Sequence, residues 1–398
     1  MCQCSFCGNS YEKNQLIEGK QGYICAGCAM ILFELLENGP EIIENIKPED
    51  FEPRQAKNTS TLSIDILKPH LIKKGLDEYI IGQEEAKRLL AMEVYSHFRN
   101  INHPEGRVKK NNICLVGPSG SGKTYLVECL SKLLNVPFVI ADATMLSKTG
   151  YVGESVSSIF ERLYYAADKD VELAERGIVF IDEIDKLSSQ FNNSNSSRGD
   201  VGTTGVQQEL LKVLEGSEVE FTVSRNRMQV SECLNTKNIL FIVGGAFVGL
   251  DEQKEKKAKG TQTIGFNSTR TTGEVAPKTT HEDLIEYKMM PELVGRLSVL
   301  VDLYALTEDE IVRVLTEAKD SVIESFKRRF ATEGIELTFQ EKTLRALAKS
   351  VQKSKIGVRG IDGQLAISLN HLLYDTLSQE EVIERIEISP EDLKLIEA

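Results

Sequence analysis

Short apolar runs alternate with stretches of helical periodicity between Leu62 and about Tyr304. The runs lie at residues 112–116, 138–141, 178–182 and 238–243. Helical periods, such as residues 124–134 and 157–167, separate them. Apolar strands spaced by helices are typical of a parallel sheet that is covered on both faces. The pattern therefore predicts an α/β domain over residues 62–304.

Amphipathic helical patterns dominate the chain beyond Leu306. They cover residues 308–329, 340–350 and 360–377. Two short apolar runs, at residues 335–338 and 383–388, are candidate strands. We expect a smaller, mostly helical C-terminal domain over residues 305–398.

Polar stretches without periodicity mark a linker and two loops. Residues 47–61 are polar and carry prolines, which is typical of a linker, so that residues 1–46 are expected to form a separate N-terminal domain. Inside the α/β domain, residues 188–205 and roughly 251–283 are long polar insertions. Insertions of this length in a compact domain are usually functional or disordered.

Five of the eight cysteines lie in the first 28 residues. Cys4 and Cys7 form one Cys-x2-Cys pair, and after seventeen intervening residues Cys25 and Cys28 form a second. This spacing is typical of a four-cysteine Zn²⁺ site, in which the filled tetrahedron makes the metal structural. A module this short buries too little apolar surface to fold alone, so zinc is expected to stabilise it. The alternative is a reactive or disulfide-forming cluster, and Cys2 competes with Cys4 as a ligand.

The charge balance narrows the classes of partner. The 398 residues carry 47 Lys and Arg against 60 Asp and Glu, a formal net charge of −13. Nucleic-acid-binding proteins usually have a basic surplus, so we expect no nucleic-acid partner. No apolar run approaches the roughly 18 to 20 residues that cross a bilayer, and the N-terminus lacks the pattern of an export signal. We therefore expect a cytoplasmic protein with no membrane partner.

Residues 117–124 read Gly-Pro-Ser-Gly-Ser-Gly-Lys-Thr and fit the phosphate-binding pattern G-x4-G-K-[ST]. A predicted strand precedes this motif and a predicted helix follows it, as the motif requires. Its glycines let backbone N–H groups surround phosphates at the positive end of the helix. Lys123 is expected to reach the β and γ phosphates of ATP, and Thr124 to hold Mg²⁺. The predicted ATP-binding positions are Pro118, Ser119, Gly120, Ser121, Gly122, Lys123, Thr124 and Tyr125.

A pair of acids follows about sixty residues later, where the apolar run at residues 178–181 ends in Asp182 and Glu183. Asp182 is expected to hold Mg²⁺ through its water shell, and Glu183 to orient and polarise the attacking water. A solvated turn is the plain alternative for two adjacent acids. Together with the phosphate-binding motif, the pair predicts ATP hydrolysis.

Longer motifs extend this pattern over the rest of the chain. They are DEYIIGQEEAKR at residues 77–88, GYVGE at 150–154, FIDEIDK at 180–186, GVQQELLKVLEG at 205–216, ILFIVGGAF at 239–247 and PELVGRL at 291–297. With the phosphate-binding motif and the four cysteines, they resemble the ClpX family of AAA+ unfoldases over essentially the whole chain. The resemblance implies a P-loop AAA+ module with a parallel sheet, a smaller, mostly helical C-terminal domain and an N-terminal zinc-binding domain.

The resemblance also implies a ring of six identical chains, with ATP bound between neighbours. Arg296, in PELVGRL, matches the arginine finger that reaches the γ-phosphate held by the adjacent subunit. An ion-paired surface arginine is the alternative. Arg359 matches a second arginine, on the small domain, that couples the nucleotide state to rotation of that domain. Ile80 and Ile81 match the apolar contacts around the adenine.

In the family that this chain resembles, ATP hydrolysis drives the threading of unfolded or tagged proteins, some delivered by adaptors, through the pore into a ClpP-type peptidase. Tyr151 and Val152 match the first pore loop, and Val201 falls where the second one lies. The peptidase-docking positions are Ile264, Gly265 and Phe266. An isolated apolar tripeptide in a polar stretch gains nothing from exposure unless it docks on another surface. The alternatives are a buried tyrosine in an ordinary turn and a loop that packs back on its own domain.

Residues 218–234 depart from the family pattern. This stretch is shorter than the matching stretch of the family. It keeps only Arg225 and Arg227, where the family carries an Arg-Lys-His cluster used to engage substrates. The departure suggests a divergent member with clients of its own, and a peptidase-independent remodelling chaperone is the alternative function. A nucleic-acid remodeller is a further alternative, against which the acidic charge argues.

Overall fold

The computed structural model describes the chain in separate stretches. They are residues 2–3, 10–11, 16–19, 22–25, 28–29, 67–103, 105, 110–147, 153–188, 197–225, 228–254, 277–319, 321–353, 359–379 and 383–393. The chain divides into two compact units, residues 1–63 and 64–398, which are described one at a time. Within the described stretches, no helix is long and apolar enough to cross a membrane.

The N-terminal unit contains two small antiparallel pairs of strands. They are β1 (Cys2–Gln3) with β2 (Ser10–Tyr11), and β3 (Leu16–Gly19) with β4 (Gly22–Cys25). Cys25 ends β4 and is buried, and Cys28 is half-buried. Cys4 and Cys7 lie outside the described residues, so the four-cysteine zinc site stays a prediction.

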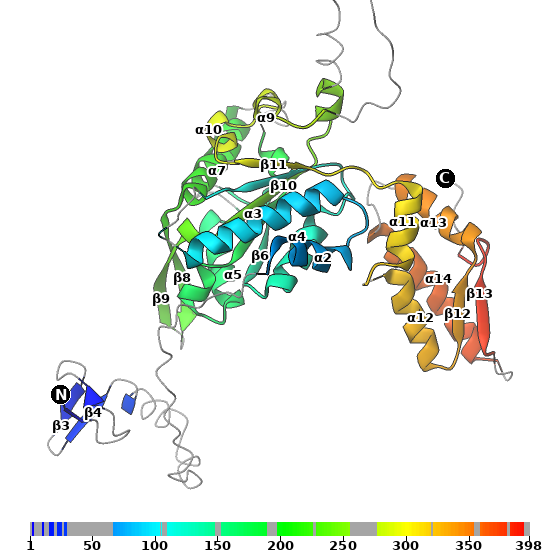
Figure 1. The fold of residues 1–398 in the computed structure, drawn as a ribbon, viewed down its shortest axis with the longest axis horizontal. Helices are drawn as coiled ribbons and strands as arrows, with labels where there is room; N and C mark the ends of the chain where they lie inside the picture. The colour runs from blue at the N-terminus through cyan, green and yellow to red at the C-terminus, as the bar shows by residue number, and fades with distance from the viewer. Residues whose placement is uncertain are drawn as a thin grey trace, which may run out of the picture. The chain divides into compact units, whose positions relative to one another are not determined.

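A five-stranded parallel sheet forms the centre of the second unit (Figure 1). Its strands, in spatial order, are β11 (Val299–Asp302), β5 (Ile113–Val116), β10 (Leu240–Gly245), β7 (Ile178–Asp182) and β6 (Phe138–Asp142). Every neighbouring pair is parallel, which confirms the α/β fold that the apolar runs predict. The edge strand β11 is not among the predicted runs, and its position at the edge leaves most of its residues half-buried.

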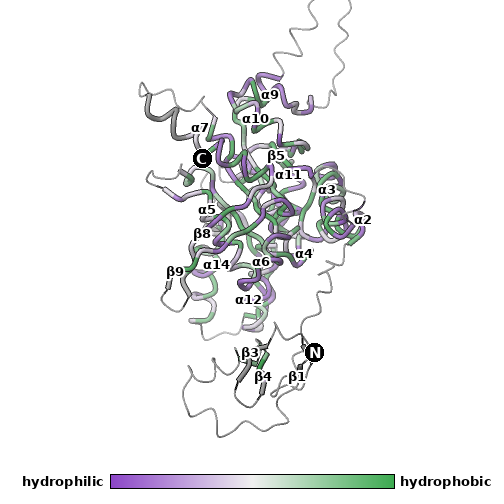
Figure 2. Tube along the Cα trace, turned by 90° about the vertical axis from the view of Figure 1, so that its left-hand side faces the viewer, coloured by the Kyte–Doolittle hydropathy of each residue, from purple (hydrophilic) through white to green (hydrophobic). Residues whose placement is uncertain are grey.

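Helices cover both faces of this sheet, and alternate strand residues face opposite layers. Ile113 and Leu115 of β5 belong to one core, and Cys114 and Val116 belong to the other. The first layer consists of α2 (Pro69–Asp77), α3 (Glu84–Asn102) and α4 (Lys123–Leu134). The second consists of α5 (Val156–Ala166), α7 (Ser197–Glu215), α9 (His281–Glu286) and α10 (Pro291–Val294). Figure 2 shows hydrophobic and hydrophilic residues alternating along these helices.

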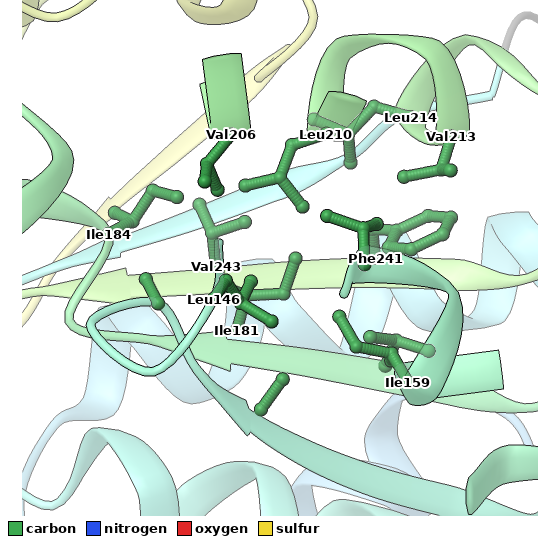
Figure 3. Close-up of a cluster of buried hydrophobic side chains, with 14 of the residues drawn as sticks. Leu146, Ile159, Ile181, Ile184, Val206, Leu210, Val213, Leu214, Phe241 and Val243 are labelled. Carbon is green, nitrogen blue, oxygen red and sulfur yellow. The ribbon is translucent and has the colours of Figure 1, made fainter. Parts of the chain in front are cut away.

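Figure 3 shows part of the second core, where α7 covers the sheet. Leu210 and Val213 of α7 lie over Phe241 and Val243 of β10, and all four are buried. Burying one such side chain contributes about 1.5–3 kcal/mol relative to leaving it exposed. This layer therefore holds α7 firmly against the sheet.

The predicted loop over residues 188–205 is wrong in its second half, because residues 197–205 form the first turns of α7. Tertiary contacts anchor the helix just beyond this point. Gln207 donates from Nε2 to Leu187 O over 2.8 Å and accepts at Oε1 from Met290 N over 2.9 Å. Anchored in this way, the helix extends back through polar residues whose own sequence favours a loop.

Residues 218–234, where the sequence departs from the family pattern, lie in an antiparallel hairpin of β8 (Glu218–Arg225) and β9 (Met228–Asn235). Phe221 is buried and packs against Tyr164 of α5, with ring centroids 5.6 Å apart. Short elements complete the unit's centre: α6 (Val171–Ala174) and two 3-10 helices, η5 (Ile184–Leu187) and η7 (Thr236–Asn238).

The C-terminal part of the second unit has a hydrophobic core of its own. Its elements are α11 (Glu308–Thr316), α12 (Val322–Thr332), β12 (Glu336–Phe339), α13 (Glu341–Lys353), α14 (Arg359–Leu377) and β13 (Arg385–Ile388) (Figure 1). The two predicted strands are present and pair in parallel. Two helices, α11 and α12, form over the helical pattern at residues 308–329, and Ser321 caps the second by accepting a bond from Glu324 N.

Candidate nucleotide site

The phosphate-binding motif lies between β5 and α4, at the edge of the sheet where the parallel strands end. Gly117 N donates to Gly245 O, at the end of β10, over 3.2 Å. Asp182 is the last residue of β7, which also neighbours β10. Loops that follow the carboxyl ends of parallel strands are where ligands of open α/β sheets bind. The fold therefore brings the two acidic residues and the phosphate loop together, as the sequence predicts.

Two polar groups of the loop are buried in a way that suits a polyphosphate. Lys123 is 8% exposed, and its Nζ donates to Gly117 O over 2.7 Å and to Pro118 O over 3.0 Å. Burial lowers the pKa of this ammonium, and the nearby carboxylates, Asp182 first among them, oppose that shift. Ser121 is 3% exposed, and its buried hydroxyl has no hydrogen-bond partner within the described part of the chain. Phosphate oxygens would satisfy this hydroxyl and offer the ammonium an anionic partner.

Glycines give the loop the backbone it needs at two positions. Gly122 has a φ of 90° at the start of α4, a conformation that side chains disfavour. At Gly117 the constraint is space and not conformation, since a Cβ there would lie 2.5 Å from Leu303 O and 2.9 Å from Leu303 Cβ. The loop is thus packed directly against the chain that leaves β11.

Replacing Gly117 by Ala should weaken ATP binding at least about tenfold and destabilise the fold by about 2 kcal/mol, because the clash is with backbone and cannot be relieved by a rotamer change. Nucleotide titration and thermal unfolding measure the two effects. Gly363→Ala is the matched control, because a Cβ there meets nothing within 4 Å among the described residues. An alanine at Gly117 that bound ATP normally would contradict this account of the loop.

Thr124 and Asp182 make a set of oxygen atoms that fits Mg²⁺. Thr124 Oγ1 donates to Asp182 Oδ2 over 2.7 Å, and Glu183 N donates to Asp182 Oδ1 over 2.9 Å. Hydroxyl and carboxylate oxygens are the ligands that Mg²⁺ takes beside phosphates and water. The backbone bond from Glu183 orients the Asp182 carboxylate toward the loop.

Glu183 begins the turn that follows β7, and its φ is 56°. This left-handed conformation is uncommon outside glycine and is often found at functional sites. Partial desolvation raises the pKa of its carboxyl, and repulsion from Asp142 and Asp182 raises it further. A carboxylate with a raised pKa is a stronger base toward a water molecule.

Ile80 and Ile81 lie in the turn between α2 and α3, and each is 9% exposed. Lys87 holds this turn, because its Nζ donates to Ile80 O over 3.0 Å. The same ammonium pairs with Asp77 at 2.5 Å and with Glu84 at 2.8 Å. Lys87 is 1% exposed and is not among the residues predicted from the sequence. Its one signal is a lysine on the apolar face of an amphipathic helix.

Arg296 lies at the other end of the strands, where β5 begins. Asn112 Nδ2, just before β5 begins, donates to Arg296 O over 3.0 Å, whereas the phosphate loop follows the end of β5. A strand of this length spans about 13 Å at 3.3 Å per residue. Arg296 is ion-paired with Glu215 at 2.5 Å and lines a pocket of about 220 Å³ with it. Its guanidinium therefore does not lie at the phosphate loop of its own chain.

Several predicted positions lie outside the described residues: Tyr151, Val152, Ile264, Gly265 and Phe266. Val201 lies within α7, and Arg359 is the first residue of α14, but only their backbones are described. Tyr125 is half-buried in the first turn of α4.

The fold and this site define the class of the protein, a P-loop ATPase of the AAA+ type. Residues 108–300 match the AAA domain family (Cdc48 subfamily). The chain is 38% identical to the ATP-dependent Clp protease ATP-binding subunit ClpX 2 of Wolinella succinogenes, over 96% of this chain and 92% of that protein. It is 37% identical to the ATP-dependent Clp protease ATP-binding subunit ClpX of Bacteroides fragilis and of Bacteroides thetaiotaomicron, over 95% of this chain and 92% of each. The chain belongs to the ClpX family and is an ATPase.

Proposed function

We propose that this ATPase unfolds proteins and translocates them through the pore of a homohexameric ring into a ClpP-type peptidase. The observation that carries the proposal is the separation of Arg296 from the phosphate loop. Arg296 lies where strand β5 begins, and the loop lies where β5 ends. In a chain built in this way, Arg296 can reach a phosphate loop only on a neighbouring chain, as a closed ring provides at every interface. The relatives' names, each an ATP-binding subunit of the Clp protease, support the same assembly.

The nucleotide site has a role for each residue. Lys123 and the loop amides bind the β and γ phosphates of ATP, and Thr124 and Asp182 would hold Mg²⁺, whose charge would offset that of the phosphates. Glu183 orients and deprotonates the attacking water. Arg296 of the neighbouring chain stabilises the charge that develops on the γ-phosphate. The remaining contacts are the adenine-binding Ile80 and Ile81, Arg359 on the C-terminal part, and the loop residues Pro118, Ser119, Gly120, Ser121, Gly122 and Tyr125.

Outside the nucleotide site, the proposal assigns three further parts of the chain. Residues 1–46 form a zinc-binding domain through Cys4, Cys7, Cys25 and Cys28, and residues 47–61 link it to the ATPase module of residues 62–304 and 305–398. Tyr151, Val152 and Val201 line the pore and grip the polypeptide. The peptidase contacts are Ile264, Gly265 and Phe266.

The test is an unfolding assay with a stable fluorescent protein that carries an unstructured tail, run with ATP and with or without a ClpP-type peptidase. Fluorescence should fall only when ATP is present, and fragments should appear only with the peptidase. Phe266→Ala should keep the unfolding rate and lose at least about 90% of the degradation, because removing an apolar anchor from its cleft costs most of a docking contact.

Two outcomes would count against the proposal. Unfolding at full rate by Tyr151→Ala would contradict the pore assignment, because the ring then moves the chain without that aromatic. Unfolding without degradation, unchanged by Phe266→Ala, would favour the peptidase-independent chaperone instead.

A further inference from the structure

A closed set of hydrogen bonds joins Gln83 to Tyr304, which are far apart in the sequence. Gln83 donates from Nε2 to Tyr304 O over 2.7 Å and accepts at Oε1 from Tyr304 N over 3.2 Å. The Tyr304 hydroxyl accepts a bond from Gln83 N over 2.8 Å and donates one to Glu310 Oε1 over 3.0 Å. Gln83 is 2% exposed. A buried amide that bonds one residue with both its donor and its acceptor fixes that residue in place. We call these three residues the Gln83–Tyr304 clamp.

Three segments of the nucleotide site meet at this clamp. Gln83 closely follows Ile80 and Ile81 in the turn between α2 and α3. Its Nε2 also lies 3.4 Å from Ser121 O, in the phosphate loop. Tyr304 lies in the connection from β11 to α11. One side chain thus contacts the phosphate loop and the chain that leaves the α/β sheet.

The backbone around the clamp is shaped for close contact. Gly82 and Gln83 both have left-handed conformations, with φ of 72° and 53°. A Cβ on Gly82 would lie 2.7 Å from Glu310 Oε1 and 2.9 Å from the Tyr304 hydroxyl oxygen, so the hydroxyl and the carboxylate pack directly on this glycine. The left-handed region is unfavourable for a glutamine, and the bonds to Tyr304 compensate for it.

The same turn holds both ends of α11. At the N-terminus, the Glu310 carboxylate accepts bonds from Thr307 N and Thr307 Oγ1, each over 2.9 Å, in addition to the bond from the Tyr304 hydroxyl. Beyond the C-terminus, Lys319 N donates to Glu78 O over 3.0 Å, and Lys319 Nζ to Glu78 Oε2 over 2.8 Å. A displacement of residues 78–83 therefore acts on α11 at two points.

We propose that the Gln83–Tyr304 clamp transmits nucleotide binding from the phosphate loop to α11, the first helix of the C-terminal part. Gln83 and Tyr304 are positioning residues in this scheme, because they act through Ser121 and Glu310 and not on the phosphates. When ATP orders the phosphate loop and the isoleucine turn, Gln83 moves with them, and Tyr304 carries the displacement to the N-terminus of α11. The inference rests on the proposed ATP site and adds to it a route by which binding reaches the C-terminal helices.

Hydrogen exchange of the full-length protein, with and without a slowly hydrolysed ATP analogue, tests the clamp. In the unmodified chain, the analogue should slow exchange in α4, beside the phosphates, and in α11 at least about threefold each. Tyr304→Phe keeps the ring and removes the two bonds of the hydroxyl. It should keep the slowing in α4 and lose it in α11, and the affinity for the analogue should change less than about threefold. Gln83→Leu should give the same separation of the two helices.

The control is Tyr374→Phe, a change at a side chain that is 72% exposed, which should leave both effects intact. If Tyr304→Phe merely speeds exchange in α11 in both states and keeps the slowing caused by the analogue, Tyr304 is structural and the proposal is overturned. If the analogue slows nothing in α4 of the unmodified chain, the ATP site is wrong and the clamp falls with it. The α4 signal therefore separates a failure of the site from a failure of the clamp.

Discussion

Replacing Glu183 by Gln should stop ATP hydrolysis and leave ATP binding intact. Glutamine matches glutamate in size and fits the same turn after β7, where Glu183 N is held by Asp182 Oδ1 at 2.9 Å. The amide cannot take a proton from water, and loss of a general base costs about 100- to 10,000-fold in rate. The change also removes one negative charge from a site that must bind polyphosphate. We therefore expect an unchanged or slightly tighter dissociation constant for ATP.

Phosphate release under saturating ATP measures the hydrolysis rate, and titration with a fluorescent nucleotide measures binding. Glu172→Gln, at an exposed glutamate of α6, is the matched control and should hydrolyse ATP at the normal rate. A Glu183→Gln protein that kept a tenth or more of the normal rate would show that another group activates the water. Loss of binding together with hydrolysis would instead show that the carboxylate supports the fold of the turn.

The signals that place the phosphate loop and its two acids together are local in the sequence. The phosphate loop is one continuous motif, and the acids Asp182 and Glu183 end an apolar run that reads as a buried strand. The strand order of a parallel sheet then brings these two segments together, a consequence of the topology. That the phosphate loop lies beside these two acids could thus be predicted without knowing any distance.

The contacts that the sequence did not predict join separate elements of the fold. Lys87 is an ordinary lysine within a helix until its bonds to Asp77 and Ile80 O are seen. Gln83 lies in the motif at residues 77–88, but nothing in the sequence pairs it with Tyr304, because the pairing depends on where β11 leaves the sheet. Residues 197–205 read as a loop because glycine and threonine disfavour helix, and tertiary contacts around Gln207 override that preference.

Replacing Arg296 by Ala should slow hydrolysis about 1,000-fold, and the loss should be repaired by a neighbouring chain. The physical reason is the placement of Arg296 at the edge of the sheet where β5 begins, away from the phosphate loop at its end. The nucleotide site of an Arg296→Ala chain keeps its own Glu183. A neighbouring Glu183→Gln chain still carries Arg296 and can supply it to that site. Mixed rings of these two inactive variants should therefore regain activity at about a quarter of their sites, the fraction of interfaces with the right order of chains.

Rings that contain both variants can be isolated by placing a different affinity tag on each and purifying through both. The decisive control mixes Arg296→Ala with the double variant Glu183→Gln/Arg296→Ala, which supplies no arginine and should restore nothing. Arg162→Ala tests whether losing an ion-paired, partly exposed arginine is harmful in itself, since Arg162 pairs with Glu154 and its side chain is 44% exposed, against 42% for Arg296. That protein should hydrolyse ATP normally. If the mixed rings stay inactive while each variant assembles and binds ATP, Arg296 does not act on a neighbour's phosphate, and its bond to Glu215 is then its main role.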